Sequence, residues 1–127
     1  MIIDYSLKQH KEIIGAVVRV LQQGKAVVYP TDTSYGLAVD ATNTQAIKKL
    51  YKIKGRNFNK PVHVVVPSLR DAKRIVKWNS TASKLAGKFW PGALTLVLGL
   101  RAKGLGLSRL SAGSGYLGIR MPNNKIA

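Results

Sequence analysis

Residues 30–37, PTDTSYGL, gather side-chain hydroxyls and a carboxylate within one short stretch. These groups belong to Thr31, Asp32, Thr33 and Ser34. The stretch follows an apolar, β-branched run at 26–29 that is typical of a buried strand, and Pro30, which has no amide N–H, should end that strand. At the end of a central strand in an α/β sheet, such groups would form a small-molecule site. Residue types alone favour an ordinary turn, because Pro, Thr, Asp and Ser all suit turns.

A second group of candidate residues consists of Lys54, Arg56 and Lys60, around Gly55, where a helix is predicted to end. Cations at the C-terminal end of a helix can simply complement its dipole. They can equally clamp a triphosphate, with arginine binding bidentately and lysine acting as a mobile point charge. The residue types alone leave both interpretations open.

Arg120 lies in the apolar segment 116–121, YLGIRM. An arginine inside an apolar strand is costly unless it meets an anion, and a substrate carboxylate would serve. An edge arginine in solvent is an equally good interpretation. No phosphate-loop motif occurs. No Ser-His-Asp pattern is supported either, since His10 and His63 lie in a predicted helix and a predicted strand with apolar neighbours, so nucleophilic catalysis is disfavoured.

Alternating helices and strands must position these groups. Helices are predicted at 6–23, 43–54, 68–77 and 80–89, and strands at 25–29, 61–66, 93–98 and 116–121. Ser6, Asn43 or Thr44, and Ser68 are the expected N-caps, and Gly24 and Gly55 the expected terminators. The continuous apolar run at 61–66 indicates a central strand, and the Gly- and Ser-rich segment 104–115 indicates a mobile loop. The alternation predicts an α/β fold with some parallel pairing.

Charge is the strongest compositional feature. Twenty-one Lys and Arg face five Asp and Glu, for a net charge of +16, which favours polyanions such as RNA or phosphorylated ligands. So few acids disfavour a carboxylate metal cage and a paired-carboxylate mechanism. The absence of cysteine and of any apolar run of transmembrane length predicts a cytoplasmic protein without membrane association. The length of 127 residues predicts one domain, 1–127.

Four motifs occur in one order: PTDTSYGL at 30–37, KGR followed by KP at 54–61, WPGALTLVL at 90–98 and GIRMP at 118–122. Together they resemble the YrdC-type domain of threonylcarbamoyl-adenylate synthases. The resemblance implies an α/β fold with a YrdC-like twisted mixed sheet, mostly parallel, with flanking helices and a concave, positively charged face. It covers nearly the whole chain.

The resemblance also implies a reaction: L-threonine, bicarbonate and ATP condense to threonylcarbamoyl-adenylate and pyrophosphate, with Mg²⁺ carried on the phosphates and no protein metal site. Thr33 and Arg120 match the threonine-binding hydroxyl and the arginine for the threonine carboxylate. Lys54 and Arg56 match the catalytic K-x-R pair that faces the nucleotide phosphates. Lys60 and Tyr116 match further nucleotide-binding positions. Implied partners are tRNA-modification proteins, because the intermediate feeds threonylcarbamoyladenosine formation in tRNA.

The sequence departs from the family pattern after GIRMP. The family chain continues to another strand and an S-x-N segment that completes the nucleotide site, and neither is found before Ala127. We therefore expect a fold lacking the C-terminal strands. The alternative function is a non-catalytic YrdC-like protein that binds tRNA or double-stranded RNA. A carbamoyl-adenylate-forming relative, similar to the domain in hydrogenase maturation proteins, is a third hypothesis.

Overall fold

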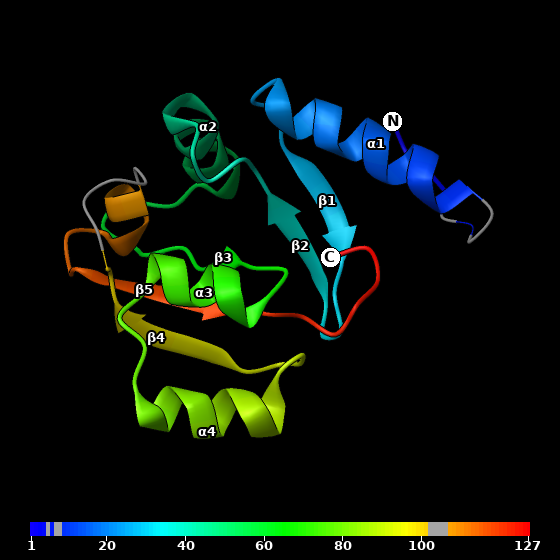
Figure 1. Ribbon diagram of the computed structural model, residues 1–127. Coiled ribbons are helices and arrows are strands. Elements are labelled where there is room, and N and C mark those ends of the chain that lie inside the picture. The colour runs from blue at the N-terminus through cyan, green and yellow to red at the C-terminus, as the bar shows by residue number, and fades with distance from the viewer. Residues whose placement is uncertain (5, 7–8, 102–106) are drawn as a thin grey trace.

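The computed structural model describes residues 1–4, 6, 9–101 and 107–127 (Figure 1). The helices are α1 (His10–Gln22), α2 (Thr44–Lys54), α3 (Leu69–Ile75), α4 (Ser80–Phe89) and the 3₁₀ helix η3 (Leu107–Ser111). The strands are β1 (Val27–Pro30), β2 (Tyr35–Ala38), β3 (Val64–Val65), β4 (Thr95–Gly99) and β5 (Tyr116–Arg120). This mixed arrangement confirms the α/β class.

The strands form two separate sheets. β1 and β2 make an antiparallel hairpin, with Pro30 opposite Tyr35. The other sheet has the order β3-β5-β4, in which β3 is parallel to β5 and β4 is antiparallel to it. Some parallel pairing is thus confirmed, but the expectation of mostly parallel strands is wrong for the described residues, because the two longest ladders are antiparallel.

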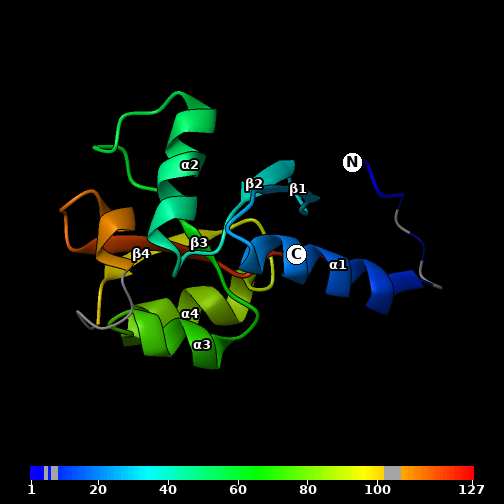
Figure 2. The same ribbon diagram turned by 90° about the horizontal axis from the view of Figure 1, so that it is seen from above.

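One face of the three-stranded sheet is packed and the other is open. Leu117 and Ile119 of β5 are fully buried and pack in one cluster with Ala72 of α3 and Ala86 of α4. Figure 2 shows α3 and α4 together on this side of the strands. Because side chains alternate along a strand, the neighbouring positions of β5 point to the uncovered side. We call this uncovered side the open face.

Local sequence signals explain where α2 begins and ends. The side-chain oxygen of Asn43 accepts hydrogen bonds from the amides of Gln45 and Ala46, and Gly55 ends the helix in the left-handed conformation with φ 58°. Residues 46, 47, 50 and 51 are buried as predicted, while the lysines of the outer face are exposed. Helices α3 and α4 also begin at side-chain N-caps. The Ser68 hydroxyl accepts from the amide of Asp71 in α3, and the Asn79 side chain accepts from the amide of Ala82 in α4. α3 ends at Ile75, two residues before the predicted end.

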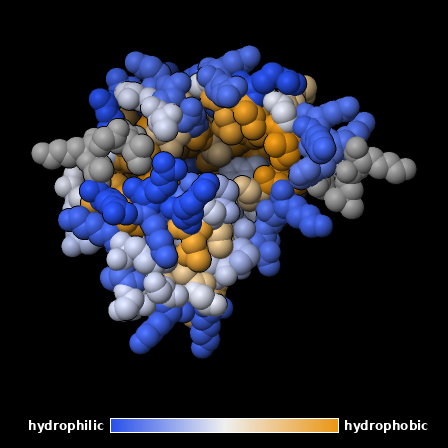
Figure 3. Space-filling model, viewed as in Figure 1, coloured by the Kyte–Doolittle hydropathy of each residue, from blue (hydrophilic) through white to orange (hydrophobic). Residues whose placement is uncertain are grey.

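Helix α1 is shorter than predicted. It begins at His10, and Gln9 precedes it without a side-chain cap. The Ser6 hydroxyl instead donates to the Gln9 side chain at 3.3 Å, so Ser6 is not the N-cap. No residue of α1 is fully buried. Figure 3 shows hydrophobic side chains around a hollow over the β1–β2 hairpin, beside α2.

Three further expectations are wrong in the described residues. The segment around β1 is not a buried central strand, because it pairs with β2 alone and Val28 is 65% exposed. The run 61–66 contributes only the two residues of β3, at the edge of its sheet. Residues 107–111 form η3, whose Leu107 and Leu110 are buried in the core. Residues 104–106 of that predicted loop lie outside the described part of the chain.

No helix among the described residues is long and apolar enough to cross a membrane.

Candidate functional site

Arg120 joins the end of β5 to the tip of the β1–β2 hairpin. Its Nε donates to the carbonyl of Gly92 at 3.2 Å, which fixes the plane of the guanidinium. Its Nη1 and Nη2 each donate to the hydroxyl of Thr33 at 3.1 Å, and Nη2 also donates to Asp32 Oδ1 at 2.5 Å. Arg120 therefore has an anionic partner, the carboxylate of Asp32, and is not an edge arginine in solvent.

The hairpin tip forms a turn that also contacts Arg120. The Thr31 hydroxyl accepts from the amides of Thr33 and Ser34 at 3.2 Å and donates to the Ser34 carbonyl at 2.6 Å. These bonds close the turn through one side chain, as Thr and Ser do in many turns. Thr33 and Asp32 are left pointing at Arg120, so the two interpretations of this stretch are compatible.

Asp32 stays ionised at this tip. Desolvation works to raise the pKa of Asp32, but the backbone amides of Asp32 and Asn123 and the Arg120 guanidinium together hold it below its usual range. The Arg120 charge also reaches Tyr29 of β1, where burial nevertheless raises the pKa of the phenol. The hairpin and β5 are thus coupled electrostatically as well as by hydrogen bonds.

His63 lies on the open face between two candidate residues. The β3–β5 register places it beside Gly118, and a Cβ built on Gly118 would be 3.1 Å from the His63 Cβ. Partial burial and the positive charges of Arg120 and Lys54 lower the pKa of His63. The charges of Lys54, at the end of α2, and of Arg120, on β5, thus both disfavour the protonated imidazole.

The other two cations of the predicted clamp lie on the connector after α2. Arg56 and Lys60 are exposed, as is Lys54. The Tyr51 hydroxyl donates to the Lys60 carbonyl at 2.6 Å, which ties the connector to the buried face of α2. Burial raises the pKa of Tyr51, and the nearby Arg56 charge opposes this. In the part of the chain that the structure describes, the sole ion pair is Asp32–Arg120, so these cations have no carboxylate partner.

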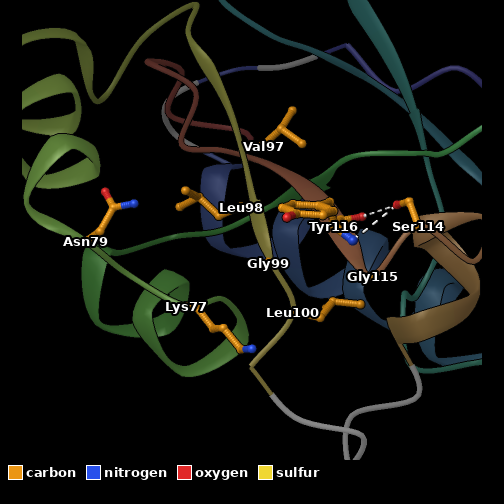
Figure 4. A pocket seen from close by; sticks show the side chains of 9 residues that line it. All are labelled: Lys77, Asn79, Val97, Leu98, Gly99, Leu100, Ser114, Gly115 and Tyr116. Atoms are coloured by element: carbon orange, nitrogen blue, oxygen red, sulfur yellow. Dashed lines mark hydrogen bonds between the residues drawn. The ribbon is translucent and has the colours of Figure 1, made fainter.

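Tyr116 lies apart from the other candidates, at the opposite end of β5 from Arg120. Figure 4 shows it in an open pocket with Val97, Leu98 and Ser114. The Ser114 hydroxyl accepts from the Tyr116 amide at 3.1 Å and donates to its carbonyl at 3.3 Å. Four residues of strand separate it from Arg120 by about 13 Å.

Sequence reasoning missed one residue of this cluster, His63, and one contact. His63 was set aside because of its apolar neighbours, yet a single polar residue alternating with core residues in a strand indicates an outward-facing position. The ion pair of Asp32 with Arg120 had no local signal, since 88 residues separate the two. Among the described residues no group of three His, Cys, Asp or Glu could hold a metal ion.

A family model described as Telomere recombination, Sua5/YciO/YrdC, matches residues 19–127. The chain belongs to the Sua5/YciO/YrdC family. A threonylcarbamoyl-AMP synthase of Bacillus subtilis is 36% identical over 115 residues, which is 90% of this chain and 33% of that relative. A relative from Methanocaldococcus jannaschii is 34% identical over 98% of this chain and 58% of its own length. This family member thus spans between a third and somewhat over half of these curated relatives.

Solved structures of the family have the same fold. The Pyrococcus abyssi Sua5 structure complexed with L-threonine matches with a TM-score of 0.83 and 32% identity, over 89% of this chain and 33% of that one. Escherichia coli YciO matches with a TM-score of 0.81 over 91% of this chain and 56% of that chain, at 23% identity. These matches confirm the YrdC-like mixed sheet.

Proposed function

We propose that this chain binds L-threonine and ATP and joins them with bicarbonate to form L-threonylcarbamoyl-adenylate. The observation that carries the proposal is the bond between Arg120 and Thr33, which presents a fixed guanidinium and a hydroxyl at one point of the open face. The family membership and the Sua5 structure with L-threonine support the same substrate.

In this proposal Arg120 binds the threonine carboxylate and Thr33 meets the threonine hydroxyl. The guanidinium already bonds to Gly92, Thr33 and Asp32, so a substrate carboxylate must displace one of these partners or use the remaining N–H. Asp32 is the natural partner to yield, because it is itself a carboxylate. Threonine and Asp32 would then compete for one cation.

Lys54, Arg56 and Lys60 are proposed to hold the nucleotide. Lys54 and Arg56 would face the phosphates as the pair that supports catalysis. These two residues and Lys60 are exposed and have no carboxylate partner among the described residues, which suits the binding of a triphosphate. Tyr116 would contact the nucleotide through its backbone, although Ser114 occupies its amide here, so that contact requires the Ser114 hydroxyl to move. Mg²⁺ would be coordinated by phosphate oxygens, since the described residues supply no cluster of protein ligands.

The chemistry needs positioning more than a protein nucleophile. The threonine amine attacks bicarbonate, and the ammonium and bicarbonate together give a carbamate, water and one proton. A carbamate oxygen then attacks the α-phosphorus of ATP, and pyrophosphate leaves. Fixed cations around the phosphates stabilise the charge that develops in this second step. The product would be handed to tRNA-modification proteins.

Pyrophosphate release tests the proposal. We expect release only when L-threonine, bicarbonate and ATP are all present, and loss of release when any one is omitted. Release that requires a carbamoyl donor and ATP but no amino acid would instead indicate a carbamoyl-adenylate-forming relative. No release above background from the complete mixture would contradict the proposal.

RNA binding is the second candidate function, and one surface favours it. No Asp or Glu occurs after Asp71, while lysines and arginines continue to the end of the chain. Arg70, Lys73, Arg74 and Lys77 repeat at helical spacing on and just after α3, and all four are exposed. The Arg101 side chain joins this basic stripe by donating to the Lys73 carbonyl at 2.8 Å. The stripe lies on the α3 side of the sheet, away from Arg120.

Two matched triple variants test this surface. Changing Lys73, Arg74 and Lys77 to Gln removes three charges from the stripe, and changing Lys48, Lys49 and Lys52 to Gln removes three exposed charges from α2. We expect the stripe variant to lose at least tenfold in affinity for a short RNA duplex and to show a shallower salt dependence, with little change for the α2 variant. Equal losses would show that net charge alone drives binding.

A further inference from the structure

His63 lies on the open face, just before the edge strand β3 and beside Gly118. In the β3–β5–β4 register, Val65, Arg120 and Thr95 form one row across the sheet. Gly118, opposite Val97, lies two residues along β5 from Arg120 and so on the same face, and His63 lies beside it. One strand spacing and two residues of rise separate the Cα atoms of His63 and Arg120 by about 8 Å. Gly118 leaves no side chain between them. A small molecule bound at Arg120 therefore lies within reach of the imidazole.

The surroundings of His63 favour its neutral form. Arg120 acts on it from β5 and Lys54 from α2, and both charges, together with partial burial, lower its pKa. The neighbouring side chain from β4 is the uncharged Thr95. The acid of this site, Asp32 on the hairpin, is bound to Arg120. His63 therefore has a free electron pair at neutral pH, whereas Asp32 is ionised but weakly basic.

The proposed reaction releases one proton that a base must accept. Threonine enters as an ammonium ion, and its nitrogen becomes nucleophilic only after a proton leaves. We propose that His63 accepts this proton from the threonine amino group and so acts as the general base for carbamate formation. The imidazole becomes imidazolium, the amine attacks bicarbonate, and the imidazolium later returns its proton to solvent. This role rests on the proposed function of the same site.

The geometry supports this assignment over the alternatives. The amino and carboxylate groups of threonine share one carbon, so a carboxylate held by Arg120 keeps the nitrogen close to that arginine. Lys54 and Arg120 are cations at neutral pH and cannot accept a proton. A general base must be unprotonated before it reacts, and the lowered pKa of His63 favours that neutral form.

A nuclear magnetic resonance titration of the imidazoles tests the resting state and the response to ligand. The chain has two histidines, His10 and His63, so His63→Gln assigns both signals. We expect the His63 pKa to lie below the free-histidine value and to change when L-threonine is added, because the substrate brings an ammonium and a carboxylate beside the imidazole. The His10 signal serves as the internal control. A His63 pKa that does not respond to L-threonine would overturn the proposal.

The pH dependence of pyrophosphate release tests the catalytic role. We expect kcat of the parent chain to fall as the pH drops through the His63 pKa. His63→Gln should lower kcat about 100-fold, change the KM for threonine by less than about threefold, and abolish that acidic limb. His10→Gln should behave as the parent does. A parent chain without release would contradict the proposed function, whereas an active His63→Gln chain with an unchanged pH profile would contradict the role of His63 alone.

Discussion

Arg120 and Thr33 are 87 residues apart in sequence, yet two hydrogen bonds of 3.1 Å join the end of β5 to the tip of the β1–β2 hairpin. The contact connects two sheets that share no strand. It also places a cation beside a hydroxyl, the pair needed to recognise a hydroxy amino acid. The proposed threonine site depends on this relationship.

Replacing Arg120 tests the cation. Arg120→Lys keeps the charge but cannot bond to Gly92 and Thr33 at once, because an ammonium lacks the planar fork of a guanidinium. We expect the Kd for L-threonine, measured by calorimetry, to rise at least tenfold. Arg109→Lys, an exposed change in η3, is the control. Equal affinity in the two variants would refute the assignment of Arg120.

Asp32 should make stability depend on pH. Its pKa is lower in the folded chain than the value of about 3.9 expected when unfolded, so its stabilising effect is complete above that value and is lost as the pH falls through the folded pKa. We expect Asp32→Asn to lower the Tm at pH 7 and the difference from the parent to shrink below about pH 4. Asp4→Asn controls for the change in charge. A Tm difference that is constant with pH would count against the ion pair.

The cap of α2 should contribute to the stability of the element that carries Lys54. The Asn43 side chain accepts two backbone amides, at 3.0 and 3.1 Å. Asn43→Ala should cost about 1 kcal/mol of unfolding free energy, measured by denaturant titration. Thr44→Ala, one residue inside the helix, should change it by less than about 0.5 kcal/mol. The reverse order would mean that Asn43 is not the cap.

Two glycines should respond oppositely to alanine. At Gly118 a Cβ would lie 3.1 Å from the His63 Cβ and 3.3 Å from Thr95 Cγ2, whereas at Gly87 of α4 nothing lies within 4 Å. Gly118→Ala should destabilise the chain by about 1–3 kcal/mol and shift the His63 resonances. Gly87→Ala should stabilise it by about 0.5–1 kcal/mol, because alanine suits a helix better. Similar effects at both positions would contradict the crowding at Gly118.

Local signals in the sequence predicted local features well. α2 and α3 were predicted because Asn43, Gly55 and Ser68 act on amides and carbonyls only a few residues away. The prediction that 61–66 forms a central strand was wrong, because an apolar run of this kind does not distinguish a central strand from an edge strand. Which strands pair with it depends on β5, more than fifty residues later.

In the candidate site, too, individual residues were predicted from sequence, whereas most of the contacts between distant segments were not. The family resemblance assigned Thr33 and Arg120 to one threonine site, and the structure shows the two side chains in contact. Arg120 also donates hydrogen bonds to Asp32 and to the Gly92 carbonyl. These contacts depend on how the hairpin packs against β5 and the segment before β4, and no local sequence pattern predicts that packing. The placement of His63 beside Gly118 likewise follows from strand register.

Calorimetric titration of L-threonine, with a non-hydrolysable ATP analogue absent and present, tests the central claim most directly. L-Valine, which has the shape of threonine without its hydroxyl, is the matched ligand. We predict saturable binding of L-threonine that tightens with the nucleotide and binding of L-valine at least tenfold weaker, because Thr33 would lose a hydrogen-bond partner. Equal affinity for the two amino acids, or no binding of L-threonine, would contradict the account.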